Sequence, residues 1–174
     1  EWSSQRSKGD SYAAVCYLSQ YGFSDRLSQA IAHGIGKADA QVQLVDLRAT
    51  DPQELTALVG DAKAVVVPTW PAEPDGELQA SIGTLLAALQ PKQLVGVYDA
   101  FGGNDEPIDA VAEQLRNQGL KPAFEPLRIR QLPQGGDYQR CEESGTDLGQ
   151  ILTRKKSIEA LRSIDANLDK ALGR

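Results

Sequence analysis

A short polar segment near the start of the chain has the residue types of an anion-binding turn. It lies between an apolar run at residues 12–18 and an amphipathic stretch that opens at Asp25. When a strand enters a helix through a short loop of Ser and Gly, several backbone N–H groups converge, and the helix dipole and hydroxyl donors favour negative charge there. The segment is therefore predicted to hold a phosphate, through Ser19, Gln20, Tyr21, Gly22, Phe23 and Ser24.

The spacing of this segment excludes two other kinds of phosphate loop. A Rossmann dinucleotide turn requires G-x-G-x-x-G, and a nucleoside-triphosphate loop requires G-x-x-x-x-G-K-[ST]. Residues 19–24 contain one glycine and no lysine. The turn therefore suits a mononucleotide better than a dinucleotide, although Ser and Gly also occur in ordinary connections between a strand and a helix.

Two later loops bring aromatic residues to the same edge of the expected sheet. The loops at 68–76 and 99–107 are long, and they contain Trp70 and Phe101. Together with Tyr21, these side chains could form walls around a flat ring above the phosphate. The alternative for each aromatic residue is that it only closes its own loop.

The elements that must position these loops are strands and helices in alternation. Apolar runs of strand length recur at residues 12–18, 42–47, 64–67, 94–98 and 123–129, and helical periodicity occurs at 25–35, 52–59, 78–89, 108–118 and 138–152. All the apolar runs except the last are nearly continuous, as in strands buried on both faces. The pattern predicts a three-layer α/β sandwich with a parallel sheet, whose ligand crevice lies at the carboxyl ends of the strands.

Several other chemistries are disfavoured by the residues present. A response-regulator receiver would need an acidic pair after the first strand, a phosphate-accepting Asp after the third and a Lys after the fifth. At those places this chain has Ser19, Thr69 and Gln131. His33 is the single histidine, and the two cysteines form no C-x-x-C pair. No zinc or di-iron site is therefore expected within the chain, and no catalytic side chain is assigned.

Length and charge narrow the class of protein further. The 174 residues suffice for one domain plus an appendage. The net charge of −6 disfavours a surface for nucleic acid, and no run approaches the ~20 apolar residues of a membrane span. Two solitary cysteines suit a reducing compartment, so a cytoplasmic location is expected. Residues 151–174 carry a charge of +3 and an apolar helical stripe, whereas the rest of the chain carries −9.

Six segments carry a resemblance to a known family. They read LSQYGFSD at 18–25, VDL at 45–47, DPQE at 51–54, AFGGNDEP at 100–107, CEESGTDLGQ at 141–150 and LDKALGR at 168–174. They resemble the flavodoxin-like domain of cyanobacterial flavodiiron proteins, also called diflavin flavoproteins, and the likeness extends from about residue 12 to the end. It implies a flavodoxin-like fold, in which a five-stranded parallel sheet of order 2-1-3-4-5 has helices on both faces.

The same resemblance implies a division of the chain and a cofactor. Residues 1–11 would be a linker, 12–153 the FMN-binding domain, and 154–174 a C-terminal helix that leads to a flavin reductase-like domain outside the chain. Residues 19–24 would hold the FMN phosphate, and the two later loops would flank its ring. The flanking residues would be Pro68, Thr69, Trp70, Pro71, Ala72, Asp99, Ala100, Phe101, Gly102 and Gly103.

The chain departs from the usual family pattern at the proposed cofactor site. Where Ser-Ala-Tyr-Gly-Tyr-Thr-Asp is usual, it has Gln20, Phe23 and Ser24, and where Ser-Tyr-Gly-Gly is usual it has Ala100 and Phe101. Two hydroxyl groups are thereby replaced by apolar groups. If both hydroxyls bond FMN, their loss lowers the affinity by roughly tenfold or more, which predicts weak or partial binding.

Two functional hypotheses follow. In the first, the chain is the FMN-binding electron-transfer module of an oxidoreductase that reduces O2 to water with NAD(P)H. Its partners would be a di-iron domain, a flavin reductase-like domain and further subunits of a homo- or hetero-oligomer. The alternative, prompted by Phe23 and Ala100, is a flavin-poor structural or dimer-interface module of the same protein. A stand-alone quinone reductase is poorly supported because the chain lacks NAD(P)H-binding features.

Overall fold

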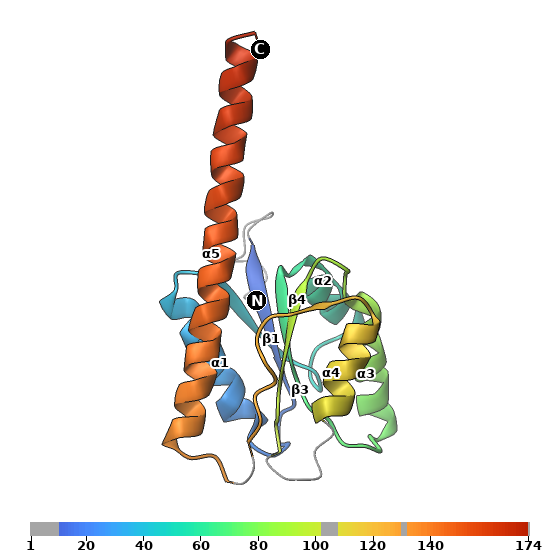
Figure 1. Ribbon diagram of the computed structural model, residues 1–174. Coiled ribbons are helices and arrows are strands. Elements are labelled where there is room, and N and C mark those ends of the chain that lie inside the picture. The colour runs from blue at the N-terminus through green and yellow to red at the C-terminus, as the bar shows by residue number, and fades with distance from the viewer. Residues whose placement is uncertain (1–10, 102–107, 130–131, 174) are drawn as a thin grey trace.

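A parallel sheet whose strands alternate with helices organises residues 11–101, 108–129 and 132–173, which the computed structural model describes (Figure 1). Its five strands stand in the order β2-β1-β3-β4-β5, and all neighbouring pairs are parallel, which confirms the predicted fold class. The elements are β1 (Tyr12–Tyr17), α1 (Ser24–Lys37), β2 (Gln41–Asp46), α2 (Pro52–Asp61), β3 (Ala64–Pro68), α3 (Gly76–Ala88), β4 (Leu94–Tyr98), α4 (Ile108–Asn117), β5 (Lys121–Pro122) and α5 (Gly135–Ala171).

Apolar side chains fill the space on both sides of the sheet. Helices α2, α3 and α4 cover one side, where they pack against Val65 and Val67 of the central strand β3. Helices α1 and α5 cover the other side, where they pack against Ala64 and Val66. Successive residues of a strand point to opposite faces, and helices cover both faces of the sheet. All four of these β3 side chains are therefore completely buried. The two layers hold the carboxyl ends of β1, β3 and β4 in one row.

Strand β2 differs from the expectation that it is buried on both faces. It pairs with β1 and ends the sheet, and its Leu44 is 41% exposed while Val45 is buried. A central strand is covered on both faces by helices, whereas an edge strand is covered only in part. Its apolar composition alone does not distinguish the two positions.

Strand β5 is shorter than predicted and begins earlier. The expected strand at 123–129 is wrong, because β5 covers Lys121–Pro122 and the chain next meets β4 in a single bridge between Tyr98 and Leu127. The ring of Phe124 occupies the space beside Gly96, where any Cβ would collide with it. Pro126 has no N–H to donate to a neighbouring strand. These two residues interrupt the ladder.

Helix α5 is continuous over 37 residues, so the expected helix at 138–152 and the expected C-terminal helix form one element. Its first half packs against α1, and its second half projects beyond the sheet (Figure 1). The apolar stripe of the second half is exposed, with Leu161 at 62% and Leu168 at 51%. In the described part of the chain, no helix combines the length and the apolar character needed to cross a membrane.

Candidate functional site

The predicted phosphate segment forms two tight turns between β1 and α1. The N–H of Tyr21 donates to the carbonyl of Leu18 at 3.2 Å, and the N–H of Ser24 donates to the carbonyl of Tyr21 at 3.1 Å. Gln20 and Gly22 both adopt a positive φ, of 62° and 54°. This conformation is uncommon for residues other than glycine, and it turns the chain sharply into α1.

Helix α1 begins without a capping side chain. Helices α2 and α3 each begin after an aspartate, Asp51 or Asp75, whose carboxylate accepts a hydrogen bond from a first-turn N–H group. The residue before α1 is Phe23, and no side-chain cap bond is formed there in the described part of the chain. The first-turn N–H groups of a helix have no partner within the helix, so those of Asp25 and Arg26 are left for an external acceptor. This is the geometry of an anion-binding helix start.

Ser24 turns its hydroxyl toward the protein interior. Its Oγ accepts from the N–H of Leu18 at 2.9 Å and lies 2.9 Å from the hydroxyl of Tyr98, which itself donates to the carbonyl of Cys16 at 2.8 Å. Since Tyr98 has one proton to donate, Ser24 is the donor between the two hydroxyls. In this conformation Ser24 joins β1, β4 and α1, so its hydroxyl is used within the protein. The side chain of Ser19 is half-buried and that of Gln20 is exposed.

The loop after β4 touches the loop after β1 through its backbone. The carbonyl of Ala100 accepts from the N–H of Phe23 at 2.7 Å. A Cβ added to Gly22 would lie 2.5 Å from that same carbonyl oxygen and 2.7 Å from the Cα of Phe101. Only glycine satisfies both this close approach and the positive φ at position 22. We call residues 18–24 together with Ala100 the cradle.

The loop after β3 is joined to the cradle through Thr69. This residue follows Pro68, the last residue of β3, and its side chain is completely buried. Its Oγ1 accepts from the N–H of Ala100 at 2.9 Å, and its own N–H donates to the carbonyl of Tyr98 at 2.9 Å. The three loops singled out from the sequence therefore meet at one edge of the sheet.

The three aromatic residues of these loops differ in their packing. The rings of Tyr21 and Phe101 lie 5.3 Å apart between centroids at an angle of 36°, and Phe101 is 52% exposed. Trp70 is half-buried against the apolar layer beneath α2, α3 and α4. Beyond it, Pro71 is half-buried and Ala72 is exposed. The edge therefore offers aromatic surface next to the cradle.

One predicted site residue, Asp99, is bonded to the segment that follows β5. The side chain of Asp99 is buried, and its Oδ2 accepts from the N–H of Ile129 at 3.4 Å. Its backbone N–H donates to the carbonyl of Leu127 at 2.8 Å. Asp99 therefore holds the segment that follows β5. Two other predicted residues, Gly102 and Gly103, lie outside the described part of the chain.

Two residues that sequence reasoning did not assign to the site support it. Tyr98 is completely buried, and burial raises the pKa of its phenol well above 10.0, so its hydroxyl stays protonated in its bond to Cys16. Asp46 ends β2, and its Oδ1 accepts from the N–H of Arg48 at 3.0 Å and lies 3.5 Å from the N–H of Ser19. The sequence contained one signal for Tyr98, which is a tyrosine at the end of an apolar strand and directly before one of the loops singled out.

Two carboxylates lie near the cradle, with Arg26 also in the first turn of α1. Asp25 lies in the first turn of α1, and the carboxylate of Asp46 approaches Ser19. These carboxylates disfavour a bound anion, whereas backbone donors and the helix dipole favour one. In the described residues, no group of three or more His, Cys, Asp or Glu side chains could hold a metal ion.

Comparison with known proteins shows a family and curated relatives. Residues 15–145 match the flavodoxin family. Over 173 residues the chain is 45% identical to Diflavin flavoprotein A 1 of Synechocystis sp., and the match covers 99% of this chain but 30% of that protein. The chain therefore spans about a third of the length of that curated relative.

Two solved structures extend this comparison. The crystal structure of a flavodoxin-like domain from a Synechococcus sp. protein is similar with a TM-score of 0.78 and 51% identity, over 82% of this chain and 99% of that one. A metal-soaked flavodiiron core from Synechocystis sp. is similar with a TM-score of 0.74 and 30% identity, over 88% of this chain and 38% of that one.

Proposed function

Because this chain belongs to the flavodoxin family, we propose that it binds FMN and serves as an electron-transfer module of a larger flavodiiron oxidoreductase. When bound, FMN supplies one- and two-electron redox chemistry. The residues of the chain bind and orient it. No side chain of the site is assigned a role in proton transfer.

The observation that carries this proposal is the start of α1, which has no capping side chain and follows Gly22, a position where a Cβ would collide with the Ala100 carbonyl. The N–H groups of Asp25 and Arg26 are suited to the phosphate, because they lack partners within the helix. Gly22 keeps the cradle backbone accessible, because a side chain there would collide with Ala100. The exposed ring of Phe101 offers apolar surface to the flavin ring and limits its contact with water.

The proposal extends to the protein of which this chain forms a part. The relatives are about three times longer, and one similar structure is a flavodiiron core. We therefore infer that a di-iron domain accepts the electrons and reduces O2 to water, and that a flavin reductase-like domain delivers them from NAD(P)H. Assembly as a homo- or hetero-oligomer and a cytoplasmic location belong to the same proposal.

The experiment is a fluorescence titration of FMN with the chain and with two glycine variants. The wild-type chain should quench FMN fluorescence with one saturable site. Gly22→Ala should weaken the binding by at least about tenfold, because the methyl group meets the Ala100 carbonyl. Gly119→Ala is the matched control, because Gly119 also has a positive φ, of 81°, but open space around its Cα. It should lower stability by about 1 kcal/mol and leave FMN binding unchanged.

The alternative, a flavin-poor structural or dimer-interface module, predicts unchanged FMN fluorescence with the wild-type chain. Its premise was the loss of two hydroxyl groups, at Phe23 and Ala100. Ala100 is completely buried among apolar neighbours, so a serine hydroxyl there would be buried as well. Phe23 is half-buried, so Phe23→Tyr is the variant expected to improve binding, by about tenfold at most. If neither chain quenches FMN at high micromolar concentration, FMN binding is excluded and the structural role is favoured.

A further inference from the structure

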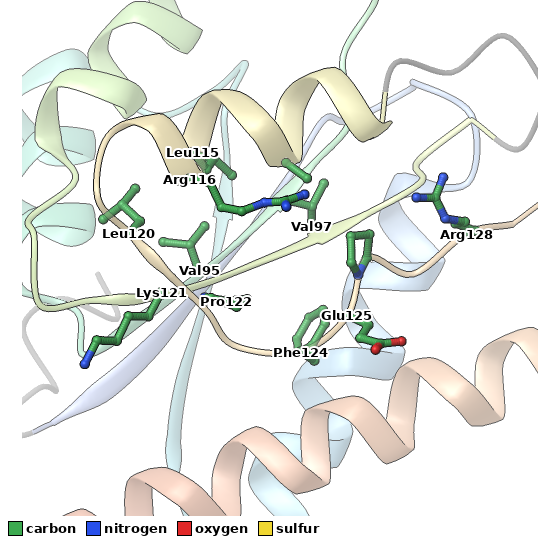
Figure 2. A pocket seen from close by; sticks show the side chains of 12 residues that line it. Val95, Val97, Leu115, Arg116, Leu120, Lys121, Pro122, Phe124, Glu125 and Arg128 are labelled. Atoms are coloured by element: carbon green, nitrogen blue, oxygen red, sulfur yellow. The ribbon is translucent and has the colours of Figure 1, made fainter.

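A pocket of about 600 Å³ lies between β4, α4 and the segment that follows β5 (Figure 2). It runs alongside β4 rather than beyond its carboxyl end, and none of the residues that line it belongs to the cradle. Its volume is within the range of about 300–1,000 Å³ found for small-molecule sites in proteins. Its existence follows from the fold, because β5 ends at Pro122 and the chain rejoins β4 only at Leu127.

The wall of the pocket is apolar. Side chains of β4 and α4 supply most of it, together with one residue between α4 and β5. These side chains are between 4% and 7% exposed, and they are Val95, Val97, Ala112, Leu115 and Leu120. The ring of Phe124 and the prolines of the segment after β5 complete it. Contact with such a surface favours an aliphatic or aromatic group, because it removes apolar area from water.

The polar groups of the pocket are mainly cationic. Arg116, Lys121 and Arg128 line it against one carboxylate, that of Glu125. Arg128 is already paired, since its guanidinium donates to Asp109 and thereby lowers the pKa of that carboxyl group. No carboxylate of the described residues forms a salt bridge with Arg116, whose side chain extends from α4 into the space above β4 (Figure 2).

We propose that this pocket binds a small amphipathic anion, an aliphatic or aromatic carboxylate whose apolar part contacts Val95, Val97 and Leu115 and whose carboxylate pairs with Arg116. The volume accommodates a chain or ring system of drug size, and the surplus of cations selects a negative head group. This site is separate from FMN binding. The chain as a whole is acidic, with a net charge of −6, so a local cationic surplus is not a property of its general surface.

The experiment is an NMR titration of the whole chain with decanoate, and with decanol and decyltrimethylammonium as neutral and cationic controls. Decanoate should shift the amide resonances of Val95, Val97 and Leu115 with saturation at low millimolar concentration. Decanol should bind more weakly, and the cation should cause no saturable shift. No decanoate shift at the pocket, or equal binding of decanoate and decanol, would overturn the proposal. Shifts of these resonances with protein concentration alone, which would indicate a second copy in the pocket, would also overturn it.

Two variants identify the groups responsible. Arg116→Gln should weaken decanoate binding about fivefold and leave decanol binding unchanged, since it removes one exposed charge pair. Arg162→Gln, on the exposed half of α5, is the matched control and should change neither. Ala112→Phe should fill the pocket and abolish both, with FMN binding as the check that the fold is kept. Unchanged decanoate affinity in Arg116→Gln contradicts the proposal even if the filled variant does not fold.

Discussion

The contact between α1 and α5 contrasts with the edge of the sheet around β5. Between the two helices the backbones touch, because a Cβ on Gly34 would collide with the Glu142 carbonyl and one on Gly145 with the Ile31 carbonyl. Around β5 the ladder is interrupted and a pocket of about 600 Å³ opens beside β4. On one face of the sheet, the contact between α1 and α5 leaves no room for a side chain at Gly34 or Gly145. At the edge around β5 there is room for a ligand.

The difference shows where the fold needs precision. The cradle lies at the start of α1, and α1 is fixed from three directions: by the close contact with α5, by the bond of Ser24 with Tyr98 and by the bond of Phe23 with Ala100. The edge beyond β4 meets these groups at one point, where Leu127 forms a bridge with Tyr98. Changes at the helix contact should therefore reach the cradle, whereas changes at the edge should leave it intact.

The largest expected effect is from Gly145→Ala. The added methyl group meets the backbone of Ile31, which cannot move without shifting α1, so the free energy of unfolding should fall by about 3 kcal/mol. Gly83→Ala is the control, since Gly83 is exposed in the middle of α3 with open space around it. It should raise stability by about 0.5–1 kcal/mol. Urea unfolding measures both, and equal effects would show that the helix contact is not tight.

The sequence predicts the position of the cradle better than its internal bonds. Segment 19–24 is contiguous and follows a buried strand, so its position at the edge of the sheet could be predicted. The interior bonds of Ser24 could not, because they depend on Tyr98, 74 residues away. The resemblance implied that Asp99 flanks the cofactor, whereas its bond with the N–H of Ile129 depends on a residue 30 positions away and could not be predicted. The end of β5 was misplaced because apolar composition does not show that Phe124 packs over Gly96.

Tyr98→Phe tests whether the hydrogen bonds of the Tyr98 hydroxyl with Ser24 and Cys16 affect FMN binding at the cradle. Removing the hydroxyl leaves the carbonyl of Cys16 and the hydroxyl of Ser24 without this partner, which should cost about 2 kcal/mol of stability. Tyr12→Phe is the matched control on the other side of the sheet, where the hydroxyl donates to the carbonyl of Leu58. Both variants should lose stability, but only Tyr98→Phe should weaken FMN binding, by about fivefold. Equal FMN affinities of the Tyr98→Phe and Tyr12→Phe variants would show that the bonds of Tyr98 do not affect the cradle.

A loss of stability at alkaline pH is expected on both sides of the sheet. Burial raises the pKa of the Cys16 thiol from 9.0 to about 12 and that of Cys141 to about 11. Well below pH 9 both thiols are neutral in the folded and unfolded chains. Above that pH the unfolded chain loses these protons first, so stability should fall by about 1.4 kcal/mol per pH unit for each thiol. Unfolding at pH 8 to 10.5 measures the slope, and Cys141→Ala should reduce it. An unchanged slope in that variant would contradict the assignment.

The most direct test of the cradle compares FMN with riboflavin, which lacks the phosphate. If backbone N–H groups at the start of α1 hold the phosphate, FMN should bind at least about thirtyfold more tightly than riboflavin. The amide resonances of Asp25 and Arg26 should then shift with FMN and not with riboflavin. Equal affinities for the two flavins, with no shift at these amides, would contradict a phosphate site at the start of α1.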